Sequence, residues 1–173
     1  IESDIPISRG LGSSAAMYVA GALGAAALHG RELTKQELLE ITDALEGHPD
    51  NLAPAIWGGF TTALAHEGRP CAVGYPVARG LRFCAFVPDF MTNTHEARAA
   101  LPKLVSHEDA AFTVAHALAL LCTLGAGDDD AIRRAMDDRL HEPYRKRLIP
   151  AFDALKHAAE SADCVAFFIS GSG

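Results

Sequence analysis

Near its N-terminus the chain reads Ile5-Pro6-Ile7-Ser8-Arg9-Gly10-Leu11-Gly12-Ser13-Ser14-Ala15-Ala16. This stretch is the most informative part of the 173 residues for the fold. An apolar, strand-like approach leads into a turn with two glycines, and two serines then open a long segment of small residues. Glycine adopts positive φ easily and, without a Cβ, lets a ligand approach the backbone. The free N–H groups and the positive dipole end of a helix N-terminus favour a phosphate. The stretch therefore predicts a strand, a phosphate-binding turn and a helix.

Two familiar phosphate-binding patterns do not fit this turn. A Walker A loop needs a lysine after its last glycine, and here serines follow. The G-x-G-x-x-G spacing of dinucleotide-binding turns is also missing. From these residues alone, an ordinary strand–turn–helix corner with a serine N-cap stays an equal alternative.

A longer string decides between these alternatives. Pro6 to Ala16 reads Pro-x-x-x-Gly-Leu-Gly-Ser-Ser-Ala-Ala, which resembles the nucleotide-binding signature of the GHMP kinases, the family of galactokinase, homoserine kinase and mevalonate kinase. A second string, Glu46-Gly47-His48-Pro49-Asp50-Asn51-Leu52-Ala53-Pro54-Ala55, is similar to a segment typical of the homoserine kinase branch. The spacing between the two strings also suits that branch, and the resemblance covers most of the chain.

The resemblance implies an α+β fold with two domains. Residues 1–79 would form the rear part of a ribosomal-S5-like, ATP-binding domain, and residues 80–173 a ferredoxin-like domain. The chain starts at Ile1 within strand-like sequence and stops at a Gly-Ser-Gly turn, so we expect a piece of a longer protein, with both domains truncated. The family's first motif is missing and its third breaks off at Gly173. We therefore expect the piece alone to be inactive and marginally stable.

The activity implied by the resemblance is transfer of the γ-phosphoryl group of ATP to the side-chain hydroxyl of L-homoserine. The product, O-phospho-L-homoserine, belongs to threonine biosynthesis. The cofactors implied are ATP and Mg²⁺. The residues expected to bind the nucleotide are Pro6, Arg9, Gly10, Leu11, Gly12, Ser13, Ser14, Ala15 and Ala16.

Glu46 is the expected magnesium ligand, together with Ser13 or Ser14. A capping box, Thr34-Lys35-Gln36-Glu37, opens a helix that ends near Glu46. A carboxylate there faces the negative end of the helix dipole and lacks a compensating cation. The ordinary alternative is a solvated surface glutamate. In the resembled family the corresponding glutamate binds the magnesium of the nucleotide, which would supply the missing cation.

The substrate is expected to lie among His48, Asp50, Asn51, Arg98 and Arg145. By resemblance, the first three surround the amino acid and the two arginines hold its carboxylate, with Arg147 as the alternative to the second. The planar fork of arginine binds a carboxylate bidentately. Glu46, Asp50 and Asn51 form the expected catalytic set, in which Asp50 positions the substrate. Without the resemblance, Asp50 and Asn51 would simply begin a short helix.

Composition limits the other functions. A net charge of −7 argues against a broad nucleic-acid or anionic-membrane surface. The uncharged segment 10–28 is rich in glycine and alanine, too weakly hydrophobic for a membrane span, and we expect a buried helix. The four cysteines have no metal or disulfide spacing and are expected to be buried, reduced thiols of a cytoplasmic protein. Further strands are expected over 60–64, 71–77, 81–87 and 164–169, and helices over 106–124 and 150–161.

Two rival functions remain. The chain could come from a GHMP kinase for another small alcohol, such as mevalonate, or from a binding module that kept the fold and lost catalysis. The two arginines and the Glu46–Ala55 string disfavour the first rival. The intact phosphate turn and Glu46 disfavour the second. A homodimer is left open.

Overall fold

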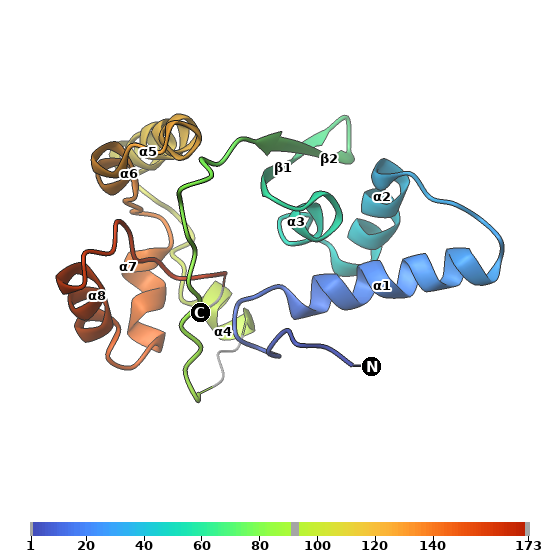
Figure 1. Ribbon diagram of the computed structural model, residues 1–173, viewed down its shortest axis with the longest axis horizontal. Helices are drawn as coiled ribbons and strands as arrows, with labels where there is room; N and C mark the ends of the chain where they lie inside the picture. Colours follow the sequence, from blue (N-terminus) through green and yellow to red (C-terminus); the bar gives the residue numbers. More distant parts are fainter. Residues whose placement is uncertain (1, 91–93, 172–173) are drawn as a thin grey trace. The chain divides into compact units, whose positions relative to one another are not determined.

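The computed structural model describes residues 2–90 and 94–171 (Figure 1). By their contacts, these residues form two compact units: residues 2–7 with 12–76, and residues 8–11 with 77–171. Residues 8–11 of the glycine turn make their contacts within the second unit. The expected domain boundary near Gly80 stays a prediction.

The first unit is built from three helices and a hairpin. They are α1 (Ser13–Leu28), α2 (Lys35–Glu46), α3 (Leu52–Trp57), β1 (Phe60–His66) and β2 (Arg69–Tyr75). The strands pair antiparallel, from Phe60 opposite Tyr75 to His66 opposite Arg69. Glu67 and Gly68 join them with positive φ values of 50° and 76°, the conformation that two-residue hairpin turns require.

The core of the first unit lies where α1 meets α2 and α3. Ala15 and Val19 of α1 are buried there with Leu38, Leu39 and Leu52. The second strand is tied to α2, because Gln36 Nε2 donates to the Pro70 carbonyl over 2.8 Å. Helices α1, α2 and α3 therefore share one apolar core.

The second unit is helical in its described residues. Its elements are α4 (Thr94–Ala99), α5 (His107–Ala126), α6 (Asp129–Ala135), α7 (Glu142–Arg145), the 3₁₀ turn η1 (Lys146–Leu148) and α8 (Phe152–Ser161). Helices α5 and α6 pack together, and His116 Nδ1 lies 3.2 Å from the Ala135 carbonyl. His116 is half-buried, and its ring stacks on that of Phe112.

The strands expected over 81–87 and 164–169 are wrong for this structure. Neither segment pairs with another strand among residues 2–90 and 94–171. A strand needs a neighbour that accepts and donates its backbone hydrogen bonds, whatever its own propensity. Phe83 and Phe86 are accordingly about two-thirds exposed, at 67% and 64%.

Two expectations about burial are also wrong. Helix α1 buries only Ala15 and Val19, while Leu23 and Leu28 are exposed. All four cysteines are free as expected, but three of them are exposed and Cys71 is half-buried. Sequence indicates how apolar a helix is, whereas burial depends on what packs against it.

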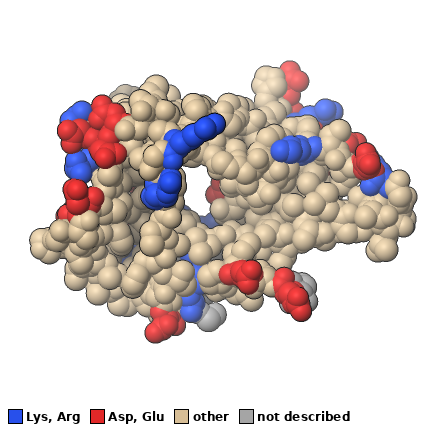
Figure 2. Space-filling view, viewed as in Figure 1, with Lys and Arg blue, Asp and Glu red and all other residues tan. Residues whose placement is uncertain are grey.

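The distribution of charge and the apolar helices concern two classes that composition disfavours, nucleic-acid-binding and membrane proteins. On the face in Figure 2, charged side chains form small groups separated by uncharged surface. One described helix, α5, has the length and hydropathy to cross a membrane, a test that core helices of soluble proteins also pass. Helix α1 is apolar too, but has only 16 residues.

The capping box that opens α2 gives a stability prediction. Thr34 Oγ1 accepts from the Glu37 N–H, and the Glu37 carboxylate accepts from the Thr34 N–H over 2.9 Å. Thr34→Ala should lower the free energy of unfolding by about 1 kcal/mol, measured by urea denaturation. Ser161→Ala, at the far end of α8 where no N–H is capped, should change it by less than about 0.5 kcal/mol. Equal losses would contradict a capping role.

The same box predicts a pH dependence. The Thr34 N–H, the Thr34 hydroxyl and Arg31 hold the pKa of Glu37 below its usual 4.5. The contribution of this carboxylate is therefore fully present above about pH 4.5, and it is lost as the pH falls through the lower pKa of the folded state. The stability difference between wild type and Glu37→Gln should be largest near pH 7 and shrink toward about pH 3. An unchanged difference would mean that the charge contributes nothing.

Candidate functional site

The first helix begins with an open N-terminus. Gly12 is its N-cap residue, in the left-handed region with φ 70° and ψ 28°. Among the described residues, no side chain caps this end, and its first turn has no acidic group. The first N–H groups of a helix lack intrahelical acceptors and lie at its positive end. The start of α1 can therefore bind an anion.

A hydrogen bond joins this open end to the end of α2. The Ser14 hydroxyl donates to Glu46 Oε1 over 2.5 Å, although the two residues are 32 positions apart. The other oxygen of Glu46, Oε2, is buried and has no hydrogen-bond partner among the described residues. Gly47 ends the helix with φ 80° and turns the chain away after Glu46. Of the two expected serines, Ser14 is the one in contact with the carboxylate.

These groups fit a magnesium ion. A buried carboxylate oxygen without a partner leaves a strong acceptor to be satisfied. Mg²⁺ prefers a few carboxylate or hydroxyl oxygens and completes its shell with phosphate and water. Among the described residues, no three His, Cys, Asp or Glu side chains gather into a metal site. A site of Glu46 and Ser14 would thus depend on a phosphate ligand, as nucleotide-bound magnesium does.

The loop after α2 arranges three polar side chains. His48 Nδ1 lies 3.4 Å from Asp50 Oδ1, in ion-pair range but without hydrogen-bond geometry. Asp50 Oδ1 also accepts from the Asn51 N–H over 2.9 Å. Asn51 is the half-buried N-cap residue of α3, and a Cβ added at Gly12 would lie 3.7 Å from its Oδ1. The expected substrate residue Asn51 is therefore beside the start of α1.

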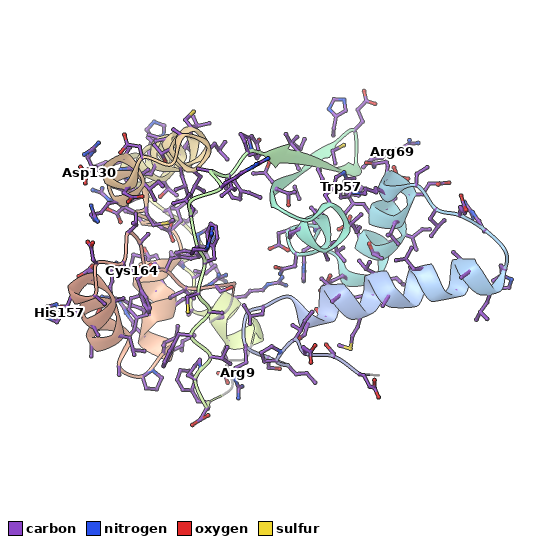
Figure 3. The ribbon with its side chains drawn as sticks, viewed as in Figure 1. Arg9, Trp57, Arg69, Asp130, His157 and Cys164 are labelled. Atoms are coloured by element: carbon purple, nitrogen blue, oxygen red, sulfur yellow. The ribbon has the colours of Figure 1, made fainter. Side chains whose placement is uncertain are left out.

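The upstream half of the glycine turn is held within the second unit. The Ser170 hydroxyl donates to the Gly10 carbonyl over 2.7 Å. A Cβ added at Gly171 would lie 3.1 Å from the same carbonyl, and Gly171 has a φ of 57°. Arg9, labelled in Figure 3, donates through Nη2 to the Asp89 carbonyl over 3.3 Å. The turn at 170–171 therefore fixes the shape of the glycine turn.

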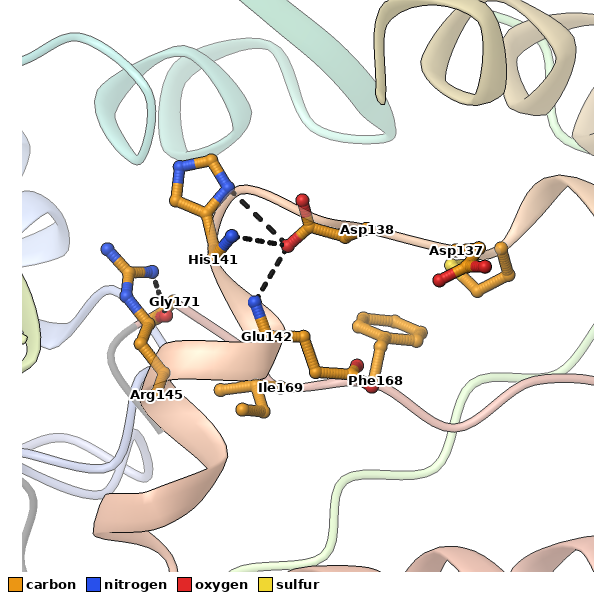
Figure 4. A pocket seen from close by; sticks show the side chains of 9 residues that line it. Asp137, Asp138, His141, Glu142, Arg145, Phe168, Ile169 and Gly171 are labelled. Atoms are coloured by element: carbon orange, nitrogen blue, oxygen red, sulfur yellow. Dashed lines mark hydrogen bonds and ion pairs between the residues drawn. The ribbon is translucent and has the colours of Figure 1, made fainter. Parts of the chain in front are cut away.

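Arg145 is fixed at one edge only. Its Nη1 donates to the Gly171 carbonyl over 2.7 Å, while its buried Nε has no partner among the described residues (Figure 4). The side chain borders a cavity of about 200 Å³ between α7 and residues 168–171. Arginine binds carboxylates bidentately, and the position of Arg145 on the cavity wall fits such a role.

Asp138 stands at the wall of the same cavity. Its Oδ1 accepts from the Leu140 N–H, and its Oδ2 from the His141 and Glu142 N–H groups, over 2.8 to 2.9 Å. Burial opposes ionisation of this carboxylate, but the three N–H donors and the nearby His141 ring outweigh it and lower its pKa. It is therefore a charged group that organises the backbone before α7.

The other expected residues lie as follows. Arg98 is exposed on α4, and Arg147 is exposed in η1. Ala15 is fully buried in the core of the first unit, so only its backbone is available to a ligand. Ser13, Leu11, Pro6 and Ala16 are half-buried.

Within the first unit, the structure brings together the start of α1, the end of α2 and the loop that follows. Within the second unit, it brings together residues 8–11, Arg145 and the turn at 170–171. Sequence reasoning missed Ser170 and Asp138. Ser170 belongs to the second glycine-rich stretch, whose composition indicated a turn but not its contact with Gly10. Asp138 stands four residues before Glu142-Pro143, where an aspartate before a proline-led helix indicates a cap.

Comparisons with known proteins agree on one family. The GHMP kinases N terminal domain matches residues 1–59, and the GHMP kinases C terminal domain matches residues 105–173. The homoserine kinase of Clostridium botulinum (strain Kyoto / Type A2) is 42% identical over 173 residues, and that of Clostridium beijerinckii is 36% identical over the same length. Both alignments cover all of this chain and 58% of the relative, so the chain spans little more than half of their length.

Solved structures give the same result. A crystal structure of homoserine kinase from Cytophaga hutchinsonii matches 99% of this chain and 56% of its own, with a TM-score of 0.87 and 32% identity. A putative homoserine kinase from Listeria monocytogenes matches with a TM-score of 0.72 and 25% identity, over 99% of this chain and 58% of its own. The α+β fold is thus the expected one, and the chain belongs to the GHMP kinase family.

Proposed function

We propose that the protein containing this chain transfers the γ-phosphoryl group of ATP to the side-chain hydroxyl of L-homoserine. The observation that supports this most is the contact between Ser14 and Glu46, which joins an open helix N-terminus to a partly unsatisfied carboxylate. Phosphoryl transfer needs positioning and charge neutralisation more than covalent chemistry. The pair would contribute to positioning, and the magnesium that it holds would supply the neutralising charge.

The nucleotide phosphates would bind at the glycine turn and the start of α1. The N–H groups of Ser13 and Ser14 would donate to phosphate oxygens, with the helix dipole behind them. Gly12 contributes a left-handed conformation and an approach without a Cβ. Gly10 and Arg9 belong to the same turn, and Ser170 holds its backbone through the Gly10 carbonyl. These residues therefore bind and orient ATP.

Magnesium would be held by Glu46 and Ser14 beside the phosphates. When bound, it neutralises charge that develops on the transferring phosphoryl group. The chain's own contribution would be Glu46 Oε2, which is buried and has no protein partner among the described residues. This favours Ser14 over Ser13 as the second ligand.

The substrate would be held by its carboxylate and oriented by polar groups. Arg145 borders the cavity beside α7, and Arg98 is the second arginine of the proposed carboxylate site. His48 and Asn51 would direct the hydroxyl. Asp50 already accepts from the Asn51 N–H and lies next to His48, which supports a positioning role for its carboxylate.

The relatives named as homoserine kinases support this choice of substrate over other small alcohols. With that substrate, the protein would act in threonine biosynthesis and work in the cytoplasm. ATP and L-homoserine would be its partners. This activity should be assayed with the protein made from its complete reading frame.

The first test concerns the metal. Glu46→Gln should lower turnover with ATP and homoserine at least tenfold, the factor that corresponds to 1.36 kcal/mol of barrier, because a carboxylate ligand is lost. A coupled assay for ADP measures it. Glu40→Gln, a matched change on the same helix at a residue that accepts from Gln36, should leave turnover within about twofold. A Glu46→Gln variant that also stays within twofold would exclude Glu46 as the ligand.

The second test concerns the substrate. Arg98→Lys and Arg145→Lys should each raise the KM for homoserine about tenfold and the KM for ATP less than twofold, because lysine keeps the charge but loses the bidentate fork. Steady-state kinetics with each substrate varied gives both constants. Arg133→Lys, at a surface arginine paired with Asp130, serves as control. Equal changes in both constants would indicate a structural role instead.

A further inference from the structure

Helix α7 is too short to hold its own position. It comprises four residues, Glu142–Arg145, and Arg145 is the last of them. A single helical turn is unstable in isolation, because nucleation costs more than its few hydrogen bonds return. The direction in which the Arg145 side chain leaves the backbone therefore depends on whatever fixes this turn.

Three backbone N–H groups at the start of α7 bind one carboxylate. Asp138 accepts from Leu140 over 2.8 Å, from His141 over 2.9 Å and from Glu142 over 2.8 Å, as Figure 4 shows for the last two. The formal N-cap residue, His141, makes no side-chain cap of its own among the described residues. Asp138 thus satisfies the donors that the turn leaves open.

Further contacts hold the side chains of α7 once its start is fixed. Glu142 Oε1 accepts from Lys156 Nζ of α8 over 3.0 Å. Arg145 Nη1 donates to the Gly171 carbonyl over 2.7 Å. Both contacts are made by long side chains, which can adjust by rotation, whereas the bonds of Asp138 act directly on the backbone. Just before the turn, the Arg139 N–H also donates to Thr113 Oγ1 of α5 over 3.3 Å. Asp138 is the side chain that binds the backbone at the start of the turn itself.

We propose that Asp138 is a positioning residue for the substrate: by fixing the start of α7, it sets where the Arg145 guanidinium meets the substrate carboxylate. This inference rests on the proposed function, in which Arg145 binds that carboxylate. Asp138 acts through Arg145, since its two oxygens accept from three backbone donors before and at the start of α7.

The effect should be large enough to measure. A displacement of about 1 Å at a group that orients a reactant can cost on the order of 100-fold in rate. Asparagine keeps one oxygen acceptor and can retain part of the cap, whereas alanine removes it completely. We therefore expect the KM for homoserine to rise about threefold in Asp138→Asn and at least tenfold in Asp138→Ala. The KM for ATP should stay within twofold in both.

The experiment measures both KM values and kcat for the two variants in the protein made from its complete reading frame. Asp130→Asn is the matched control, an exposed aspartate on α6 paired with Arg133. Thermal melting of each protein accompanies the kinetics. A merely structural role would lower the active fraction and hence kcat, without separating the two KM values. If the alanine variant fails to fold, the KM for homoserine of Asp138→Asn tests the positioning role instead.

A double-mutant cycle then asks whether Asp138 acts through Arg145. In the Arg145→Lys background, Asp138→Asn should have little further effect on the KM for homoserine, because the group it positions is already replaced. Multiplying effects, or equal KM changes for both substrates, would overturn the inference while leaving the proposed function intact. A wild-type protein that does not phosphorylate homoserine would overturn the proposed function, and the inference with it.

Discussion

The hydrogen bond from Ser14 to Glu46 is the interaction on which the proposed site depends. A carboxylate at the C-terminal end of α2 is unfavourable by itself, since it faces the negative end of that helix's dipole. The Ser14 hydroxyl and the positive end of α1 offset this cost by donating to the carboxylate and attracting its charge. The core formed by Ala15, Val19, Leu38, Leu39 and Leu52 packs the two helices against each other. Packing and function are thus coupled in the first unit.

In the second unit, backbone carbonyls hold the residues around the glycine turn in place. Gly10 and Gly171 both present carbonyl oxygens, and these accept from Ser170 and from Arg145. Hydrogen bonds to a charged guanidinium are stronger than those between neutral groups. Arg145 therefore stabilises the turn at 170–171 through its Nη1. A residue proposed to bind substrate is in this way also part of the structure around the glycine turn.

The sequence predicted correctly those features that depend on residues close together in the chain, such as helix caps. The capping box at Thr34 and Glu37 appears as expected, because it needs only residues three positions apart. The contact between Ser14 and Glu46 joins distant parts of the chain and was anticipated only through family resemblance. The strands over 81–87 and 164–169 were not found, because pairing depends on a neighbouring strand. The apolar composition of α1 likewise could not tell which of its faces would be covered.

The groups proposed for binding lie at the ends of helices, and elementary helix physics explains why. Inside a helix, backbone donors and acceptors satisfy each other, so only side chains are left for a ligand. At the ends, free N–H groups, free carbonyls and the dipole remain available. Ser14 and Glu46 stand at the two kinds of end, and Arg145 ends a single turn whose start needs Asp138. A short helix can then orient an arginine as well as a long one, provided that a charged cap replaces the cooperativity that length would have supplied.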